Sequence, residues 1–513
     1  MTHAPAAEHP SAILKTIGLQ STSANSGLVV GGEKQQASGE PFLPRSAIDG
    51  QPLAEITLSA SPDLPPTLKA AKEAFHHWRL VPSPARGELV GSFGDRLREE
   101  TSALSALIAW EVGKLRADAE AEVHEVIALC DHLEELSRHL SSESTISERS
   151  AHRVAEQWYP LGIVGLLTSF RNPVASWSQH ALLALICGNS TIWKPSEKAP
   201  LCALACHELL ASAACEMSQV PPGLFSIMVG GKALGMEIAS SPEIPLVCAT
   251  GRPPMGRAVG AAVSGRLGHV ILTLRGNNSL IVTETADLHL AVPTIIRCAL
   301  DSAAYRSAPL HRIIVHDSIK DELLKRLVSQ CQALSVGNPL EASTQMGPLI
   351  DKDALHVYEK TLEEAQRSGG VVHHGGRSSS GLDGGAYVSP AVVEVDPYHP
   401  LGQQEARTPM LILSAYRTLE EAIQLQNSVP QSHSSAIFTG YVQEAEVFCG
   451  PAGSDAPLVN VNTGPSNNGG HASGAKSGAY PEETTPSPWQ SFMRRAMNTI
   501  SYSESLPIGK QPL

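Results

Sequence analysis

Residues 268–316 decide how the rest of the chain is interpreted, and they read GHVILTLRGNNSLIVTETADLHLAVPTIIRCALDSAAYRSAPLHRIIVH. An apolar, strand-like run (269–274) ends at the polar break RGNN (275–278), and a second apolar run (280–282) follows. A segment with helical spacing then leads to an exposed polar turn and another strand. This order is typical of an α/β enzyme that presents a nucleophile beside a cofactor, and Ser307 occupies the turn.

Repeated strand–helix units lie on both sides of this stretch. Between residues 163 and 265, apolar runs rich in β-branched residues each lead into a helix-like segment. Because strands are apolar on both faces when helices cover a parallel sheet, these units predict a doubly wound parallel sheet. Similar units after the stretch predict a second α/β domain. The expected organisation is a cofactor-type domain (30–145 and 163–285), a catalytic-type domain (286–488) and a ribbon (146–162 and 489–508).

The ribbon is expected because Arg149–Tyr159 and the segment near Asn498–Ser503 both alternate polar and apolar residues. Neither segment has an obvious partner within the two domains. We therefore expect the two strands to pair with each other and to protrude. Exposed strand edges invite pairing with another subunit, so the ribbon predicts a homodimer or a tetramer.

Composition excludes several classes of partner. The net charge of −13 argues against a nucleic acid or an anionic membrane as the main partner. No apolar run reaches about 18 residues, which a membrane-spanning helix needs. The first residues lack the pattern of a secretory signal, and the nine cysteines include no C-x-x-C, so a cytoplasmic location is expected. His124-Glu125 begins like a zinc motif but lacks the second histidine, and no metal site is predicted.

Several longer motifs together carry a family resemblance, although each alone is weak. They are EVGK (111–114), EQWYPLGIVG (156–165), CGNSTIWKPSEKAPL (187–201), ATG…MGR (249–257), GNN (276–278), HRIIVH (311–316), MGPLID (346–351) and MRRAMNTISYS (493–503). From about Ile13 to Pro507 the chain resembles the aldehyde dehydrogenase superfamily, and within it the antiquitin-like branch. That branch oxidises α-aminoadipic semialdehyde in lysine breakdown. The resemblance implies the family's two α/β domains and its oligomerisation ribbon.

The catalytic positions that the resemblance implies carry different residues here. The family uses a cysteine nucleophile, a glutamate general base and an asparagine that holds the oxyanion; the matching positions are Ser307, Thr273 and Arg171. A hydroxyl has essentially no anion at neutral pH, whereas a thiol is a few per cent ionised unaided. Loss of one oxyanion donor alone costs about 10²–10³ in rate. We therefore expect a catalytically inactive homologue, a pseudoenzyme with a structural, regulatory or scaffold role.

Three alternatives remain open at this point. The first is an NAD-dependent semialdehyde dehydrogenase of lysine catabolism with residual activity. The second is a hydrolase that uses Ser307 as nucleophile, although no histidine or aspartate matches a triad by local motif. The third is an anion-binding protein. An active paralogue or pathway enzyme is a possible partner in a mixed oligomer.

The cofactor positions implied by the resemblance are mixed. Lys194 and Glu197 match the positions that hold the adenosine ribose, and Glu405 matches the nicotinamide-ribose carboxylate. The phosphate turn, however, reads Gly251 followed by Arg-Pro-Pro, and proline has no backbone N–H to offer a phosphate. We therefore expect no cofactor, or NAD bound weakly at a vestigial site.

An arginine cluster is expected where the family keeps small or uncharged residues. Its members are Arg171, Arg252, Arg275 and Arg407, joined by Arg306, which the family pattern retains. Guanidinium groups that share a crevice need anionic partners, because an unpaired buried charge is costly. The partners would be protein carboxylates such as Glu405 and Glu197, or a bound carboxylate or phosphate ligand.

Overall fold

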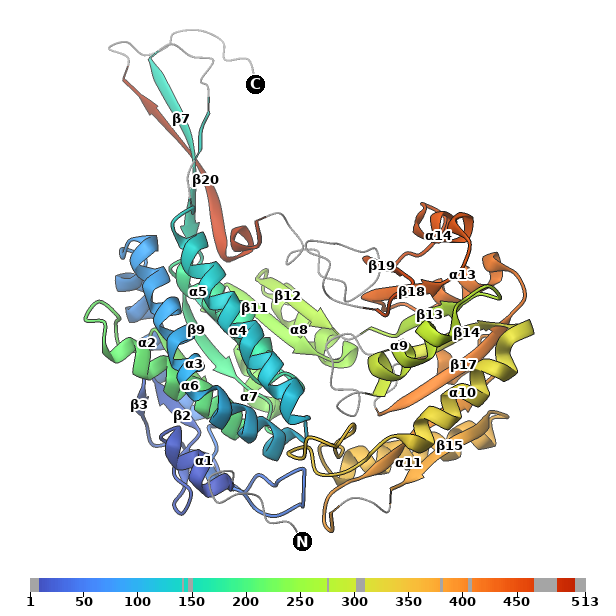
Figure 1. Cartoon of the computed structure of the whole chain (residues 1–513). Coiled ribbons are helices and arrows are strands. Elements are labelled where there is room, and N and C mark those ends of the chain that lie inside the picture. Colours follow the sequence, from blue (N-terminus) through green and yellow to red (C-terminus); the bar gives the residue numbers. More distant parts are fainter. Residues whose placement is uncertain are drawn as a thin grey trace.

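Two α/β lobes and a projecting ribbon make up the structure, which is a computed structural model (Figure 1). It describes residues 9–140, 143–145, 151–274, 276–300, 310–378, 382–404, 408–465 and 487–502. The predicted α/β fold is confirmed: both lobes are built on a seven-stranded sheet covered by helices.

The sheet of the first lobe has the strand order β12-β11-β8-β9-β10-β2-β3. Its strands are β2 (Leu28–Val30), β3 (Glu33–Lys34), β8 (Ile163–Leu167), β9 (Ser190–Lys194), β10 (Phe225–Met228), β11 (Leu246–Gly251) and β12 (His269–Leu274). The strands from β12 to β10 are parallel, while β2 and β3 add an antiparallel edge.

Helices cover both faces of this sheet, as the apolar strands predict. One face carries α3 (Ser83–Val112), α4 (Arg116–Ser137), α5 (Ala175–Ile186) and α6 (Pro200–Cys215), and the other α2 (Leu64–Trp78), α7 (Lys232–Ser240) and α8 (Pro253–Gly265). Successive side chains of a strand point to opposite faces. Val164 and Leu166 of β8 accordingly lie in the core under α3–α6, and Ile163 and Leu167 in the core under α7 and α8.

The buried carboxylate of Glu111 ties the end of α3 to the start of α6. It is 1% exposed and accepts the backbone N–H groups of Leu201 (2.8 Å) and Cys202 (2.7 Å). Helix N-termini favour negative charge, yet burial dominates and raises the pKa of Glu111 to about 7. Gly113 then ends α3 in the left-handed conformation (φ 82°), which favours glycine.

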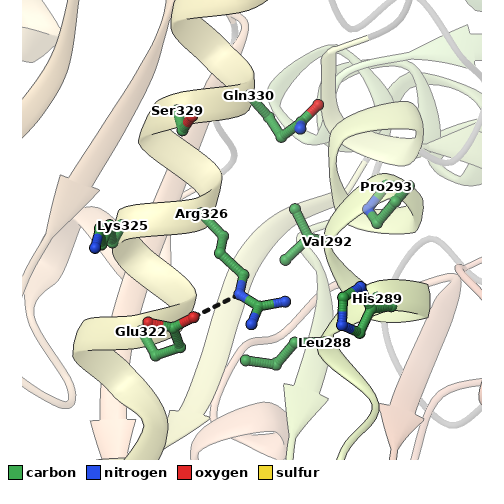
Figure 2. A pocket seen from close by; sticks show the side chains of 9 residues that line it. All are labelled: Leu288, His289, Val292, Pro293, Glu322, Lys325, Arg326, Ser329 and Gln330. Carbon is green, nitrogen blue, oxygen red and sulfur yellow. Dashed lines mark hydrogen bonds and ion pairs between the residues drawn. The ribbon is translucent and has the colours of Figure 1, made fainter.

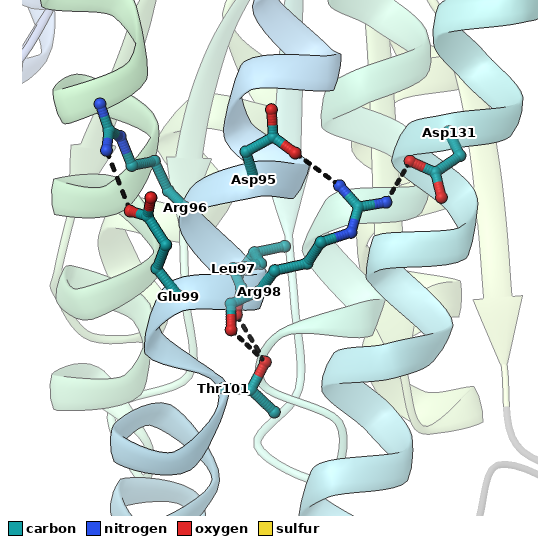
Figure 3. Close-up of polar contacts among 7 residues, drawn as sticks. All are labelled: Asp95, Arg96, Leu97, Arg98, Glu99, Thr101 and Asp131. Carbon is teal, nitrogen blue, oxygen red and sulfur yellow. Dashed lines mark hydrogen bonds and ion pairs between the residues drawn. The ribbon is translucent and has the colours of Figure 1, made fainter.

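Charged side chains also connect α3 and α4 at the surface (Figure 3). Arg98 reaches Asp95 on its own helix (2.7 Å) and Asp131 on α4 (2.5 Å). Because these side chains are largely exposed, such pairs contribute little to stability.

The second lobe has the sheet order β15-β16-β17-β14-β13-β18-β19. Its strands are β13 (Asn278–Val282), β14 (Leu310–His316), β15 (Val371–Arg377), β16 (Val388–Glu394), β17 (Met410–Tyr416), β18 (Ser434–Phe438) and β19 (Leu458–Val461). Its helices are α9 (Leu288–Leu300), α10 (Lys320–Ala333), α11 (Lys352–Arg367), α12 (Pro400–Gln403), α13 (Leu419–Asn427) and α14 (Val442–Cys449). β13, which the sequence division placed in the first domain, pairs with β14 and β18 in this sheet. Periodicity alone does not tell to which of two parallel sheets a short apolar strand belongs.

The predicted ribbon pairing is confirmed. β7 (His152–Pro160) and β20 (Met493–Ser501) are antiparallel along their whole length, and β6 (Glu143–Thr145) adds a third strand to β7. The ribbon extends away from the first lobe (Figure 1). Its role in assembly stays a prediction.

Short elements complete the N-terminal part of the first lobe. They are α1 (Pro10–Thr16) and a small sheet of β1 (Asn25–Ser26), β5 (Ile56–Thr57) and β4 (Pro41–Phe42). Ile13 and Leu14 of α1 are buried, which anchors the helix to the core.

Candidate active site

The carboxyl ends of the parallel strands in the first lobe meet at one edge of the sheet, where α/β proteins bind ligands. Register pairing places Leu167 beside Lys194, and Thr250 beside Thr273. Gly251 is the last residue of β11. Three of the residues singled out in the sequence, Lys194, Gly251 and Thr273, therefore lie at this edge.

Lys194 and Glu197 form an ion pair at the end of β9. Lys194 Nζ lies 3.3 Å from Glu197 Oε2, and Lys194 is 8% exposed while the Glu197 side chain is half exposed. Burial lowers the pKa of Lys194, and Glu197 opposes that shift. The pair offers a cation and a carboxylate to a polar ligand at the sheet edge.

The turn after β11 begins α8 with two prolines. Arg252 is the N-cap residue and Pro253 and Pro254 are the first helical residues, so neither of the first two positions has an N–H. The backbone N–H of Gly256 donates to Arg252 O within the helix (3.0 Å). A Cβ at Gly251 would lie 2.4 Å from Met255 Cε, so the tip of that flexible side chain packs directly against the glycine.

The loop before α5 holds Arg171 at the position expected for the oxyanion asparagine. Arg171 is buried, with 8% exposed. Asn172, the next residue, is directed elsewhere: its Oδ1 accepts a hydrogen bond from Lys114 Nζ (2.8 Å). Lys114 in turn is paired with Glu122 of α4 (2.7 Å), and both side chains are almost fully buried.

Glu122 also fixes the start of α5. Its Oε1 accepts the backbone N–H groups of Val174 (3.0 Å) and Ala175 (2.9 Å). One buried carboxylate thus satisfies two N–H groups that the helix cannot satisfy itself. The sequence motif EVGK supplies Lys114 for this network, a role that the motif alone did not reveal.

His180 on α5 is a residue that the sequence reasoning missed. Its Nε2 lies 3.5 Å from Thr273 Oγ1, although the two residues are 93 positions apart. Histidine on an apolar helix carries no signal for such a contact, and only the packing of α5 on β12 shows it.

Five of the residues singled out in the sequence lie outside the described residues. They are Arg275, Arg306, Ser307, Glu405 and Arg407. Of the expected arginine cluster, Arg171 and Arg252 are described, and whether all five converge stays a prediction.

A groove of about 290 Å³ lies elsewhere, between α9 and α10 (Figure 2). Its polar lining includes His289, Lys325 and an Arg326–Glu322 ion pair of 2.7 Å. None of the residues at the sheet edge lines it.

The described part of the chain holds no group of three or more His, Cys, Asp or Glu side chains that could bind a metal ion. It also has no helix long and apolar enough to cross a membrane.

Comparison with known proteins shows the family of the chain. A family model described as "Aldehyde dehydrogenase family" matches residues 35–497. The chain belongs to the aldehyde dehydrogenase family. It is 36% identical to aldehyde dehydrogenase family 7 member B4 of Arabidopsis thaliana over 500 residues, which are 97% of each chain. It is 34% identical to α-aminoadipic semialdehyde dehydrogenase of Bos taurus over 475 residues, 92% of this chain and 88% of that one. The family expected from the sequence is confirmed.

Solved structures in the family correct one expectation. Betaine aldehyde dehydrogenase from Staphylococcus aureus, solved in complex with NAD+, superposes with a TM-score of 0.89 at 21% identity, over 98% of each chain. The expectation that no cofactor is used, or that NAD is weak and vestigial, is contradicted by such NAD+ complexes of the aldehyde dehydrogenase fold. That expectation gave too much weight to the N–H groups lost at Pro253 and Pro254. Lys194, Glu197 and Gly251 lie at the sheet edge, and their part in holding NAD+ stays a prediction.

Proposed function

We propose that this protein is an NAD(P)-binding aldehyde dehydrogenase that oxidises a semialdehyde at a low rate. The observation that carries the proposal is the sheet edge of the first lobe, where Lys194, paired with Glu197, and Gly251 end the two parallel strands on either side of β8. By family resemblance the first two hold the adenosine ribose. At Gly251 the tip of the flexible Met255 side chain takes the place that a Cβ would occupy, so a ligand has only to displace that tip.

The low rate follows from the residues at the reacting centre. With Ser307 as nucleophile, the reactive anion is scarce at neutral pH unless a base assists. Arg171 replaces an uncharged amide donor by a cation. Thr273 cannot accept a proton from water. These groups act as a unit, so their losses are not additive.

The substrate class comes from the relatives. The Bos taurus relative is named for α-aminoadipic semialdehyde, and we propose a semialdehyde of that chemical type, with a carboxylate remote from the aldehyde. Arg171 at the sheet edge adds a cation that favours an anionic substrate.

The test measures binding and turnover separately. Calorimetry is expected to show NAD+ or NADP+ binding in the micromolar range, and absence of binding to either dinucleotide would refute the proposal. Turnover of the semialdehyde is expected to exceed that of a heat-inactivated control. Ser307→Cys alone is expected to raise turnover little, and the triple variant Ser307→Cys, Thr273→Glu, Arg171→Asn to raise it much more.

A second candidate is favoured by the same three substitutions: an inactive family member with a structural or regulatory role. It predicts dinucleotide binding without any turnover of aldehydes above the control. Homo-oligomerisation through the ribbon and a cytoplasmic location belong to both candidates.

A further inference from the structure

The groove between α9 and α10 of the second lobe is formed by one face of each helix (Figure 2). Five of its lining residues come from α10 and four from α9. They are Glu322, Lys325, Arg326, Ser329 and Gln330, and Leu288, His289, Val292 and Pro293. Because residues three and four apart are neighbours on a helix surface, these spacings give each helix one continuous side of the groove.

Pro293 places an irregular turn of α9 in the wall of the groove. Proline inside a helix has no N–H, so the carbonyl of His289, four residues earlier, loses its usual helical donor. The proline ring also clashes with that carbonyl, which kinks or breaks a helix. Both residues line the groove, so the irregular turn lies on the side of α9 that faces α10.

The base of the groove is apolar. Val292 is 4% exposed and belongs to the hydrophobic core of the second lobe, and Leu288 packs against the same core. Together with the ring of Pro293 they form a surface that a short hydrocarbon chain would cover. Removing this surface from water favours binding of such a chain.

Arg326 points its guanidinium group from α10 toward α9 (Figure 2). Its Nε donates to Glu322 Oε1 (2.7 Å), one turn earlier on the same helix. Within the described part of the chain, neither Nη of Arg326 has a hydrogen-bond partner. The guanidinium group therefore offers the groove a planar edge of free N–H donors.

The charges of the lining favour an anion. Lys325 and Arg326 are cations and Glu322 is the one carboxylate in the lining, so the lining is net positive even with a neutral His289. The chain as a whole carries a net charge of −13, which repels anions in general. The groove thus combines a positive lining with an apolar base on a molecule of the opposite charge.

We propose that the groove binds a small aliphatic carboxylate. Its carboxylate would accept from the free Nη groups of Arg326, and its hydrocarbon chain would cover Leu288, Val292 and Pro293. A carboxylate matches the planar fork of a guanidinium in a bidentate pair. The volume of about 290 Å³ lies at the lower end of the range for small-molecule sites, so the ligand is a short chain. The site is separate from the sheet edge of the first lobe and does not rest on the proposed function.

The experiment titrates the full-length protein with sodium hexanoate by calorimetry at fixed ionic strength. Hexanoate is expected to bind with a dissociation constant of about 1 mM or below. Hexanol keeps only the hydrocarbon chain and inorganic phosphate keeps only the anion, so each is expected to bind at least about tenfold more weakly. Arg326→Met is expected to weaken hexanoate binding about 10- to 100-fold, because the charge-assisted hydrogen bonds are lost.

The matched control is Arg367→Met. Arg367 pairs with Glu363, also four residues earlier, on α11 of the same lobe (2.9 Å), but it does not line the groove. Its replacement is expected to leave hexanoate binding unchanged. Arg326→Lys keeps the charge without the planar fork and should bind hexanoate with intermediate affinity. Arg326 and Glu322 both lie at the surface, so these variants are expected to fold.

Three outcomes would overturn the assignment. They are no binding of hexanoate at ten times the expected dissociation constant, equal affinity of the wild type and Arg326→Met, and an equal loss in Arg367→Met. Phosphate binding as tight as hexanoate binding would refute the carboxylate class. Neither turnover nor dinucleotide binding is a readout here, so failure of the proposed function would leave the hexanoate result standing.

Discussion

Removal of the buried Lys114 side chain should destabilise the first lobe more than removal of an exposed arginine. Lys114→Met leaves Glu122 with the two N–H groups of α5 but without its cation at 2.7 Å, and Asn172 without its donor at 2.8 Å. Breaking a buried pair by removing one partner costs about 3–5 kcal/mol. Because two hydrogen bonds to the Glu122 carboxylate survive, we expect the free energy of unfolding to fall by the lower end of this range, about 3 kcal/mol.

The assay is thermal unfolding at fixed protein concentration, with a double-mutant cycle. A loss of about 3 kcal/mol lowers the midpoint by roughly 6–12 °C for an unfolding unit of 150–250 residues. Adding Glu122→Gln to Lys114→Met removes the uncompensated carboxylate, so the double variant should lose less than the sum of the single variants.

The control is Arg98→Met, which removes an ion pair to Asp131 of α4 at the surface. Exposed pairs contribute about 0–1 kcal/mol, so its midpoint should scarcely move. Equal shifts for Lys114→Met and Arg98→Met, or strict additivity in the cycle, would refute the reasoning that the buried network positions α5.

Three further predictions concern other parts of the molecule. The raised pKa of Glu111, about 7, means that the folded state binds more protons than the unfolded state between roughly pH 4.5 and 7. Stability should therefore fall as pH rises through that range. In a plot of the unfolding midpoint against pH, Glu111→Gln should show a smaller fall than the wild type. Parallel plots for the two proteins would contradict this. Gly251→Ala places a Cβ 2.4 Å from Met255 Cε and must displace that side chain, so it should weaken NAD+ binding about tenfold, or about 1.4 kcal/mol, by calorimetry. Gly265→Ala, where nothing lies within 4 Å, should not weaken it. Charges introduced at the exposed Met497 and Ile500 of β20 should reduce the oligomer size in light scattering, and a monomeric wild type at micromolar concentration would exclude the ribbon as an interface.

The fold was largely predictable because its signals are local. Apolar runs followed by helix-like segments predicted the alternation of strands and helices that both lobes show. The ribbon followed from two alternating segments without partners. The boundary between the lobes was not predictable, because β13 and β12 are adjacent in the chain and equally apolar but pair in different sheets.

The candidate site was predictable only where a residue's position in a strand decides its place. Lys194 and Gly251 end parallel strands and Thr273 is the last residue but one of another, so topology alone brings them to one edge. The contact between His180 and Thr273 depends instead on how α5 is rotated on the sheet. That rotation is set by the Trp177–Trp193 stack, which no local motif encodes.

The structure also bears on whether the substitutions at the reacting centre reflect loss of use. A buried ion pair is weak support for stability, since hydrophobic residues of similar volume often stabilise as well or better. Yet Lys114 and Glu122 are buried together. Lys114 donates a hydrogen bond to Asn172, and Glu122 accepts the first N–H groups of α5. Relaxed selection on the site would remove the reason to keep so costly an arrangement. Its presence next to Arg171 and at the start of α5, the helix that carries His180, is better explained by a site that still needs α5 in one place. This favours slow catalysis over a purely structural role.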